Sequence, residues 1–330
     1  MSALLKVDHL SRDFDVSAPW LNRVIERKGR QSVKAVDDVT LHIEKGKTFA
    51  LVGESGSGKS TIARMVVGLI EPTRGAVKFD EVDIWDKRNA KKLGELRQRF
   101  QMIFQDPYAS LNPRWRVRDI VAEPLKTYGL ATSQKEIDAE VGRLLETVKL
   151  SPEDGLKYPH QFSGGQRQRI CIARALANKP EFIVCDEPTS ALDVSVQAQI
   201  LNLMRDLQDE FGLTYLFISH NLAVVNYMAD EVGVLYLGRL CEIAPPKRLF
   251  ENARHPYTRS LLDSVPDMDM SGRERTPVKG EIPNPISPPS GCFFHPRCPH
   301  ANDRCRREAP LMLPQDGVVV ACHGVEEGRI

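Results

Sequence analysis

Residues 53–61 read GESGSGKST, and they follow directly on the apolar run TFALV of residues 48–52. The stretch fits G-x-x-x-x-G-K-[ST], a pattern whose glycines let backbone N–H groups turn inward around phosphates. Residues 60–70 are predicted to form a buried helix, whose N-terminus adds a positive dipole end. The stretch therefore predicts strand, phosphate-binding loop and helix, an order that many nucleotide-binding folds share. The residues expected to touch the nucleotide are Gly53, Ser55, Gly56, Ser57, Gly58, Lys59, Ser60 and Thr61.

A second apolar run, FIVC at residues 182–185, leads into Asp186 and Glu187. One carboxylate can hold Mg²⁺ through its water shell, and the other can orient an attacking water. Phosphoryl transfer depends mainly on such positioning and on neutralising developing charge. Acidic residues are common at strand ends, so the pair alone favours a structural role. Its place downstream of a phosphate-binding loop reverses that preference.

The rest of the first 245 residues alternates between strand and helix patterns. Residues 4–16 are predicted to be a strand, and residues 34–54 two short strands hinged at 44–47. Apolar positions between 106 and 160 recur at helical spacing, which indicates a mainly helical insertion. Helices at 165–177 and 194–211 then alternate with strands at 182–185 and 214–218. This order predicts a parallel sheet covered by helices on both faces.

Composition limits the partners and the location of the chain. Its 330 residues carry 45 Lys and Arg against 44 Asp and Glu, so no strong field of one sign favours nucleic acid. No apolar run approaches the roughly 18–20 residues of a membrane span, and no signal peptide precedes these runs. A cytosolic location is expected, with the seven cysteines reduced or bound to metal rather than in disulfides.

The stretch FSGGQ at residues 162–166 resembles the signature motif of ABC ATPases. In that family the signature of one subunit closes over the nucleotide held by another. The resemblance implies that a hydroxyl, backbone donors and a helix N-terminus reach the γ-phosphate on a partner subunit. Taken by itself, the motif also suits a helix-capping turn. The residues implied are Ser163, Gly164, Gly165 and Gln166.

Further motifs match this family in order along the chain. Gln105 in FQDP resembles the Q-loop glutamine, and Ser190, Ala191, Leu192 and Asp193 resemble the D-loop. His220 stands where the γ-phosphate sensor belongs, although a lone histidine after a strand is more often structural. Phe14 matches the aromatic that stacks on adenine, and a core position suits it equally. The resemblance implies ATP and Mg²⁺ as cofactors, with Glu187, His220 and Gln105 catalytic and Ser60, Gln105 and Asp186 at the magnesium.

The end of the chain narrows the resemblance. HPYTRSLLDSVP, KGEIPNPISPPSGCFFHPRCPHANDRC and VVVACHG are similar to the C-terminal region of oligopeptide/dipeptide importer ATPases. This implies a second ATPase subunit (a paralogue or an identical copy), two polytopic membrane permeases and an extracytoplasmic substrate-binding protein. The chain would sit peripherally at the cytoplasmic face of the bacterial inner membrane. Importers for nickel, glutathione or oligosaccharide remain alternatives, as does a non-transport ABC ATPase acting on DNA or protein.

The fold expected from these motifs is α/β: a RecA-like P-loop NTPase core of the ABC ATPase type with an inserted helical subdomain. Residues 1–250 are assigned to the nucleotide-binding domain, with the helical subdomain at about 106–165. Pro and Gly then rise sharply, so residues 251–330 are expected to form a small, loop-rich C-terminal domain.

Cys292, Cys298, Cys305 and Cys322 crowd into this tail, which shows no obvious core of its own and so calls for a staple. Four thiolates suit zinc or a [4Fe–4S] cluster, although the spacings miss the tight C-x₂-C knuckle. The family resemblance places [4Fe–4S] above zinc, and reduced cysteines in a flexible tail are the alternative.

Residues 17–33 are polar and basic, without clear periodicity, and are expected to be a loop. Trp20 and Ile25 beside Arg23 and Arg27 also allow a short amphipathic helix that touches membrane subunits or lipid headgroups.

Overall fold

The computed structural model describes residues 3–19, 23, 29–264 and 280–330. The chain divides into two units. Unit 1 comprises Met1–Leu4, Ile43–Thr48 and Asp86–Ser219, and unit 2 comprises Leu5–His42, Phe49–Trp85 and His220–Ile330. Within the described residues, no helix combines the length and the apolar character needed to span a membrane.

Unit 1 contains parallel strands in the order β6, β7, β8, which are Phe100–Ile103, Phe182–Asp186 and Thr214–Ile218. Phe182 pairs with Phe100 on one side and with Thr214 on the other. Every residue of β7 and β8 is buried, as expected for apolar strands of a parallel sheet covered on both faces. The predicted strands at 182–185 and 214–218 are confirmed, and β7 extends one residue further to Asp186.

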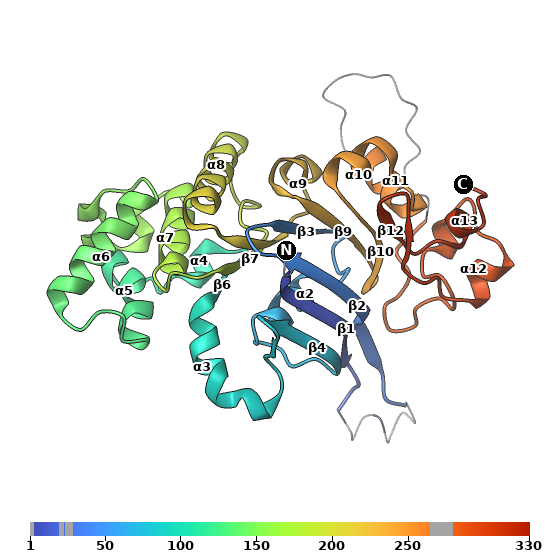
Figure 1. Cartoon of the computed structure of the whole chain (residues 1–330), viewed down its shortest axis with the longest axis horizontal. Helices are drawn as coiled ribbons and strands as arrows, with labels where there is room; N and C mark the ends of the chain where they lie inside the picture. Colours follow the sequence, from blue (N-terminus) through green and yellow to red (C-terminus); the bar gives the residue numbers. More distant parts are fainter. Residues whose placement is uncertain (1–2, 20–22, 24–28, 265–279) are drawn as a thin grey trace. The chain divides into compact units, whose positions relative to one another are not determined.

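Unit 1 also contains several helices, and Figure 1 shows α5, α6 and α7 packed side by side. The α6 helix starts at a capping box, in which Ser133 Oγ accepts the N–H of Glu136 and the Glu136 carboxylate accepts the N–H of Ser133. The helical content predicted for residues 106–160 is confirmed. The helical elements are η1 (Lys87–Asn89), α3 (Ala90–Arg99), α4 (Pro107–Ser110), α5 (Val117–Thr127), α6 (Gln134–Thr147), η2 (Pro152–Leu156), η3 (Pro159–Gln161), α7 (Gly164–Leu176) and α8 (Val194–Phe211).

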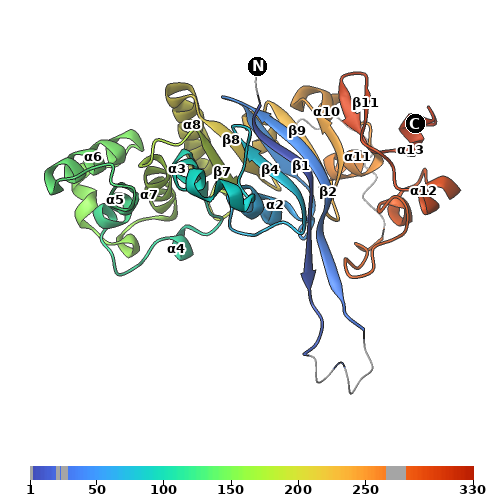
Figure 2. The same cartoon turned by 60° about the horizontal axis from the view of Figure 1, so that its bottom comes forward.

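Most of the remaining strands lie in unit 2. β3 (Thr48–Val52) pairs in parallel with β9 (Glu231–Tyr236), and β9 pairs antiparallel with β10 (Arg239–Ala244). A separate sheet has the order β2, β1, β4, β5, and Figure 2 shows β1 and β2 running side by side. Those strands are Ser32–Glu44, Ala3–Asp15, Arg74–Phe79 and Val82–Asp83. The predicted strand at 4–16 and the hinge at 44–47 are confirmed.

The helix after the phosphate-binding loop is shorter than predicted. α2 spans Lys59–Val66, whereas the sequence predicts a helix over residues 60–70. Gly68 adopts a φ of 75°, and the N–H of Leu69 bonds back to the carbonyl of Arg64 at 2.8 Å. A glycine in the left-handed region with such a backward bond ends a helix, which apolar periodicity alone does not reveal.

The C-terminal tail, predicted to show no obvious core of its own, shares the core of unit 2. β12 (Val318–Val320) pairs with β10, and β11 (Leu313–Gln315) pairs with β12. Phe294 is buried in the same apolar cluster as Tyr236 and Tyr257. The other helical elements of unit 2 are α9 (Leu222–Met228), α10 (Pro246–Asn252), α11 (Pro256–Asp263), η4 (His295–Arg297), α12 (Asp303–Arg307) and α13 (His323–Glu326).

The hypothesis of an amphipathic helix near the N-terminus falls outside the described residues. It rests mainly on positions within 20–22 and 24–28. The amphipathic helix therefore stays a prediction.

A buried histidine makes the stability of unit 2 depend on pH. Burial lowers the pKa of His255 from 6.5 to about 3, and its Nδ1 accepts the N–H of Tyr257 at 3.0 Å. Between these two values the unfolded chain binds more protons, so the stability from neutral His255 is lost as pH falls below about 6.5.

We expect acidification from pH 7 to pH 5 to reduce the free energy of unfolding through this group by about 2 kcal/mol. Urea unfolding of His255→Asn at both pH values should show a pH dependence smaller by that amount. The same substitution at the exposed His160 serves as the control. Identical pH dependences for His255→Asn and the unaltered chain would contradict the assignment.

Candidate active site

The loop between β3 and α2 closes tightly on neighbouring backbone. Gly53 has a φ of 152° and Gly58 a φ of 106°. A Cβ on Gly53 would lie 2.1 Å from the carbonyl oxygen of Leu235, and one on Gly58 would lie 2.3 Å from that of Ala35. Only glycine fits both positions, since the contacts are with backbone that cannot turn away.

Lys59 and the first turn of α2 face this loop in unit 2. The Lys59 side chain is largely buried, and its Nζ donates to the carbonyl oxygens of Gly53 at 2.8 Å and Glu54 at 3.0 Å. Gly58 is the N-cap of α2 and offers no capping side chain. Backbone N–H groups at such a helix start suit an anion, and an ammonium group beside them adds to the attraction.

The acidic pair lies at the end of β7 in unit 1. Asp186 is the buried last residue of the strand, and Glu187 follows with a φ of 47°. The N–H of Glu187 donates to the carbonyl oxygen of Ile218 in β8 at 3.0 Å. Gln105 Nε2 donates to Glu187 Oε2 at 3.1 Å. The structure thus brings together two residues that the sequence assigned to catalysis from separate motifs.

FSGGQ forms the start of α7 in unit 1. Ser163 is the N-cap, its Oγ accepts the N–H of Gln166 at 3.3 Å, and Gln166 Oε1 accepts the N–H of Ser163 at 3.0 Å. The capping turn considered for this motif is therefore present. A Cβ on Gly164 would lie 3.3 Å from Leu192 Cδ2, so the motif packs beside residues 190–193.

Gly165 is more tightly enclosed, because an added Cβ would lie 2.3 Å from Val196 Cγ1 at the start of α8. We expect Gly165→Ala to lower the free energy of unfolding by about 1–3 kcal/mol through overpacking. The matched control is Gly142→Ala in α6, where the nearest atom to the added Cβ, Pro152 Cβ, is 3.6 Å away. That control should gain up to about 1 kcal/mol. Urea unfolding tests both, and equal midpoints for the two variants would contradict the packing argument.

Residues 190–193 continue from the acidic pair into α8. The Ser190 hydroxyl donates to the carbonyl oxygen of Glu187 at 3.1 Å. Asp193 caps α8 by accepting the N–H of Val196 at 2.9 Å, and this bond holds the pKa of its carboxyl below the usual range. Ala191 and Leu192 lie between these two anchors. The turn is thereby tied to the catalytic candidate at one end and to a helix start at the other.

Phe14 and His220 belong to unit 2. Phe14 is half-buried in β1, with the Arg12 guanidinium carbon 4.7 Å from its ring centroid. His220 is exposed just before α9, which Asn221 caps by accepting the N–H of Ala223 at 3.0 Å. Unit 2 also carries the phosphate-binding loop, whereas unit 1 carries Gln105, Asp186, Glu187 and the FSGGQ turn.

Tyr257 lies in HPYTRSLLDSVP, but nothing in that stretch predicts that it contacts the phosphate-binding loop. Its hydroxyl accepts the N–H of Glu54 at 3.0 Å, across 203 positions of sequence. Tyr257 is fully buried in α11. A tyrosine on the buried side of a short helix looks like an ordinary core residue, so only the fold reveals this contact.

The predicted [4Fe–4S] cluster is not supported, nor is the zinc alternative. Within the described residues no three His, Cys, Asp or Glu side chains are grouped so that they could hold a metal ion. Burial raises the pKa of Cys292 to about 12 and raises those of Cys298 and Cys322, so these three side chains are thiols when no metal is bound. The shared core of unit 2 removes the need for a staple. All seven cysteines, which lie in the described part of the chain, are outside disulfides.

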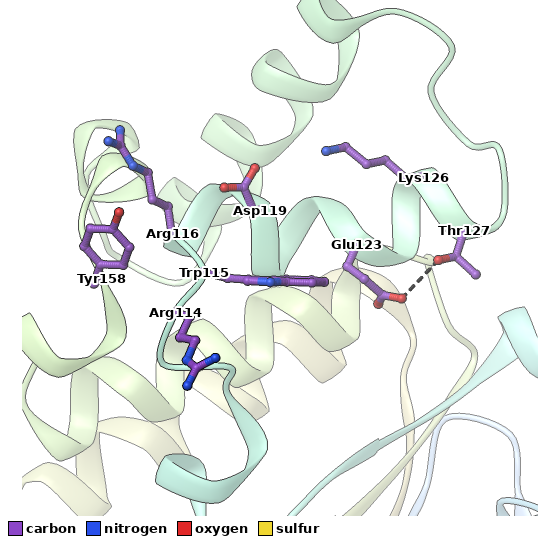
Figure 3. Close-up of a pocket in the computed structure, with 8 residues that line it drawn as sticks. All are labelled: Arg114, Trp115, Arg116, Asp119, Glu123, Lys126, Thr127 and Tyr158. Atoms are coloured by element: carbon purple, nitrogen blue, oxygen red, sulfur yellow. Dashed lines mark hydrogen bonds between the residues drawn. The ribbon is translucent and has the colours of Figure 1, made fainter.

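A pocket of about 440 Å³ opens in unit 1 beside α5 (Figure 3). Trp115 is 45% exposed there, and the Arg116 guanidinium carbon lies 5.8 Å from the ring centroid of Tyr158. Aromatic side chains and arginines are enriched at protein contact surfaces. The lining residues are Arg114, Trp115, Arg116, Asp119, Glu123, Lys126, Thr127 and Tyr158.

Comparison with known families gives two matches along the chain. Residues 36–190 match the family described as ABC transporter. Residues 241–305 match the family described as oligopeptide/dipeptide transporter, C-terminal region. The first match includes the phosphate-binding loop, the FSGGQ turn and the acidic pair.

Similarity to individual proteins extends over nearly the whole chain. It is 47% identical over 328 residues to the di/tripeptide transport ATP-binding protein DppF of Pseudomonas aeruginosa, covering 99% of each chain. It is 50% identical over 316 residues to the oligopeptide transport ATP-binding protein AppF of Bacillus subtilis, covering 94% of this chain and 95% of that one.

Solved structures give the same fold. The ATP-binding cassette MJ0796, solved as a dimer bound to ADP and phosphate, matches with a TM-score of 0.63 and 28% identity. The match covers 73% of this chain and 98% of that one. CbiO1 from Clostridium perfringens, part of an ABC transporter complex, matches with a TM-score of 0.62 and 26% identity over 76% and 92% of the two chains.

Proposed function

This chain belongs to the ABC transporter ATP-binding proteins, and from that premise we propose that its hydrolysis of ATP powers peptide import. The observation that carries the proposal is the near full-length similarity to peptide-transport ATP-binding proteins, which includes the match of residues 241–305. The α/β fold of an ABC ATPase cassette and the phosphate-binding loop agree with this activity.

In this proposal the loop from Gly53 to Thr61 wraps the phosphates of ATP, and Lys59 leaves its loop carbonyls to meet the outer phosphates. Phe14 stacks on the adenine, next to the Arg12 guanidinium already on its ring. Mg²⁺ neutralises phosphate charge when bound, and its ligands would be Ser60, Gln105 and Asp186. Their hydroxyl, amide and carboxylate oxygens are donors that suit this hard cation.

Glu187 is proposed to orient and polarise the attacking water. Its position is fixed by the backbone bond to Ile218 and by the Gln105 amide, so the carboxylate is held before the reaction begins. Gln105 contacts that carboxylate directly, and His220 is proposed to contact the γ-phosphate. Each of these three residues acts by position, as phosphoryl transfer requires.

A second ATPase subunit is needed to complete each site. We propose that Ser163, Gly164, Gly165 and Gln166 meet the nucleotide held by the partner, with Ser190–Asp193 beside them. The N-terminus of α7 would then supply backbone donors to the γ-phosphate. The partner is a related ATPase or an identical copy.

We propose two polytopic membrane subunits and an extracytoplasmic substrate-binding protein as the other partners, with this chain at the cytoplasmic face of the inner membrane. The pocket around Trp115 is proposed as the surface that meets a membrane subunit, because exposed aromatic anchors in pockets concentrate binding energy.

We also propose two domains. They are residues 1–250, with a helical subdomain at about 106–165, and residues 251–330.

Purification of the tagged chain from detergent-solubilised membranes tests this assembly. We expect two polytopic membrane proteins to copurify, and we expect Trp115→Ala to reduce their recovery. Leu130→Ala is the control, since Leu130 is similarly exposed in the same unit but lies outside the pocket. A complex with DNA and without membrane proteins would contradict the transport proposal. Uptake of nickel, glutathione or an oligosaccharide instead of peptide by the purified complex would correct the substrate.

A further inference from the structure

Glu54, the second residue of the phosphate-binding loop, is held by an arginine from the C-terminal tail. Arg297 Nη1 and Nη2 donate to the two carboxylate oxygens of Glu54 at 2.9 and 3.0 Å. The Arg297 side chain is 5% exposed and that of Glu54 is 26% exposed. Two parallel charge-assisted bonds of this kind fix both the charge and the orientation of a carboxylate.

The core of unit 2 fixes this arginine. Arg297 Nη1 also lies 3.3 Å from the hydroxyl of Tyr236. The ring of Phe294, in the same tail segment, lies 5.3 Å from that of Tyr236 and 5.4 Å from that of Tyr257 between ring centroids. Tyr257 in turn accepts the N–H of Glu54. These packed aromatic rings therefore hold the Arg297 guanidinium in place and shield it from solvent.

Glu54 links Arg297 to Lys59. Its carbonyl oxygen accepts from Lys59 Nζ at 3.0 Å, while its carboxylate accepts from Arg297. An uncompensated carboxylate in a loop that cradles polyphosphate repels the ligand, because both carry negative charge. Arg297 supplies the compensating charge from a residue 243 positions away.

We propose that Arg297 is a positioning residue for the nucleotide: it neutralises and orients Glu54, so that the C-terminal tail sets the affinity of the loop for phosphates. This inference rests on the proposed function, since the loop must bind ATP. The tail thereby acts on the ATPase site of its own subunit.

The test is the dissociation constant of MgATP for the full chain, measured by titration calorimetry. Arg297→Met keeps a long side chain against the aromatic rings and removes the charge, and we expect it to weaken binding about tenfold. The charge-retaining Arg297→Lys should weaken binding less than Arg297→Met does, because it keeps the charge but cannot form the two parallel bonds. The double variant Glu54→Gln with Arg297→Met should return to within about threefold of the unaltered chain, because no uncompensated charge remains.

The weakening in Arg297→Met should shrink at high salt, a response that lost packing alone does not give. If that variant does not fold, Arg297→Gln serves instead, since it keeps a donor for Glu54 without the charge. Arg254→Ala, which breaks the 3.0 Å ion pair with Asp316 in the same unit, is the matched control and should not change the dissociation constant.

A folded, uncharged variant at 297 that binds MgATP within twofold of the unaltered chain would overturn the inference. So would a double variant that binds as weakly as the single one. If the unaltered chain itself bound no MgATP, the proposed function would fail together with the inference.

Discussion

Glu187→Gln is expected to lower ATP turnover about a thousandfold while MgATP binding stays within about threefold of the unaltered chain. The amide keeps the size of the side chain and an oxygen that can accept from Gln105, so the local geometry survives. It cannot polarise a water as a carboxylate does. Phosphate release from the assembled complex at saturating MgATP measures the loss, and the variant should accumulate as a dimer with ATP trapped.

The matched control is Glu153→Gln, an exposed glutamate of η2 in the same unit. It should turn over ATP at the rate of the unaltered complex. Turnover of Glu187→Gln near that same rate would remove Glu187 from its assigned role.

Lys59→Met is expected to weaken MgATP binding about 100-fold, the effect of losing charge-assisted bonds to phosphate. The ammonium group is buried and already directed into the loop by its bonds to the carbonyl oxygens of Gly53 and Glu54. The midpoint of thermal unfolding should rise with MgATP in the unaltered chain, and this rise should disappear in the variant.

Lys78→Met is the control for charge, because Lys78 lies in the same unit and pairs with Asp8 at 2.8 Å on β1. It should keep the full nucleotide-dependent rise. An equal rise in Lys59→Met would contradict the phosphate-binding assignment of the loop.

The sequence predicted those elements whose ends are marked by local chemistry. The predicted helix at 194–211 matches α8, because Asp193 caps its start and Gly212, with a φ of 65°, ends it. The buried strand β8 likewise matches the predicted residues 214–218, since a short and largely apolar run between Gly212 and Ser219 contains it. Local signals of this kind need no knowledge of the rest of the chain.

Contacts between distant segments could not be predicted in this way. Tyr257 and Arg297 both reach Glu54, over 203 and 243 positions, and neither the helix nor the strand period relates such residues. The pairing of β12 with β10 is of the same kind. The motifs identified the phosphate-binding loop, but only the fold reveals the distant side chains that contact it.

The metal site predicted from the cysteines is not supported by the described residues. Four cysteines in a Pro-rich tail predict a metal site when the tail is assumed to have no core. Phe294 instead places that tail in the apolar cluster of unit 2, and burial raises the pKa values of Cys292, Cys298 and Cys322. Whether a thiol is buried is decided by tertiary packing, which spacing along the chain does not encode.

Uptake of a labelled peptide by vesicles that contain the purified complex and its substrate-binding protein tests most directly whether this chain powers peptide import. We predict accumulation against a gradient that requires MgATP on the side of the ATPase subunits and is lost when the chain carries Glu187→Gln. Accumulation without MgATP, or equal accumulation with Glu187→Gln, would contradict that role.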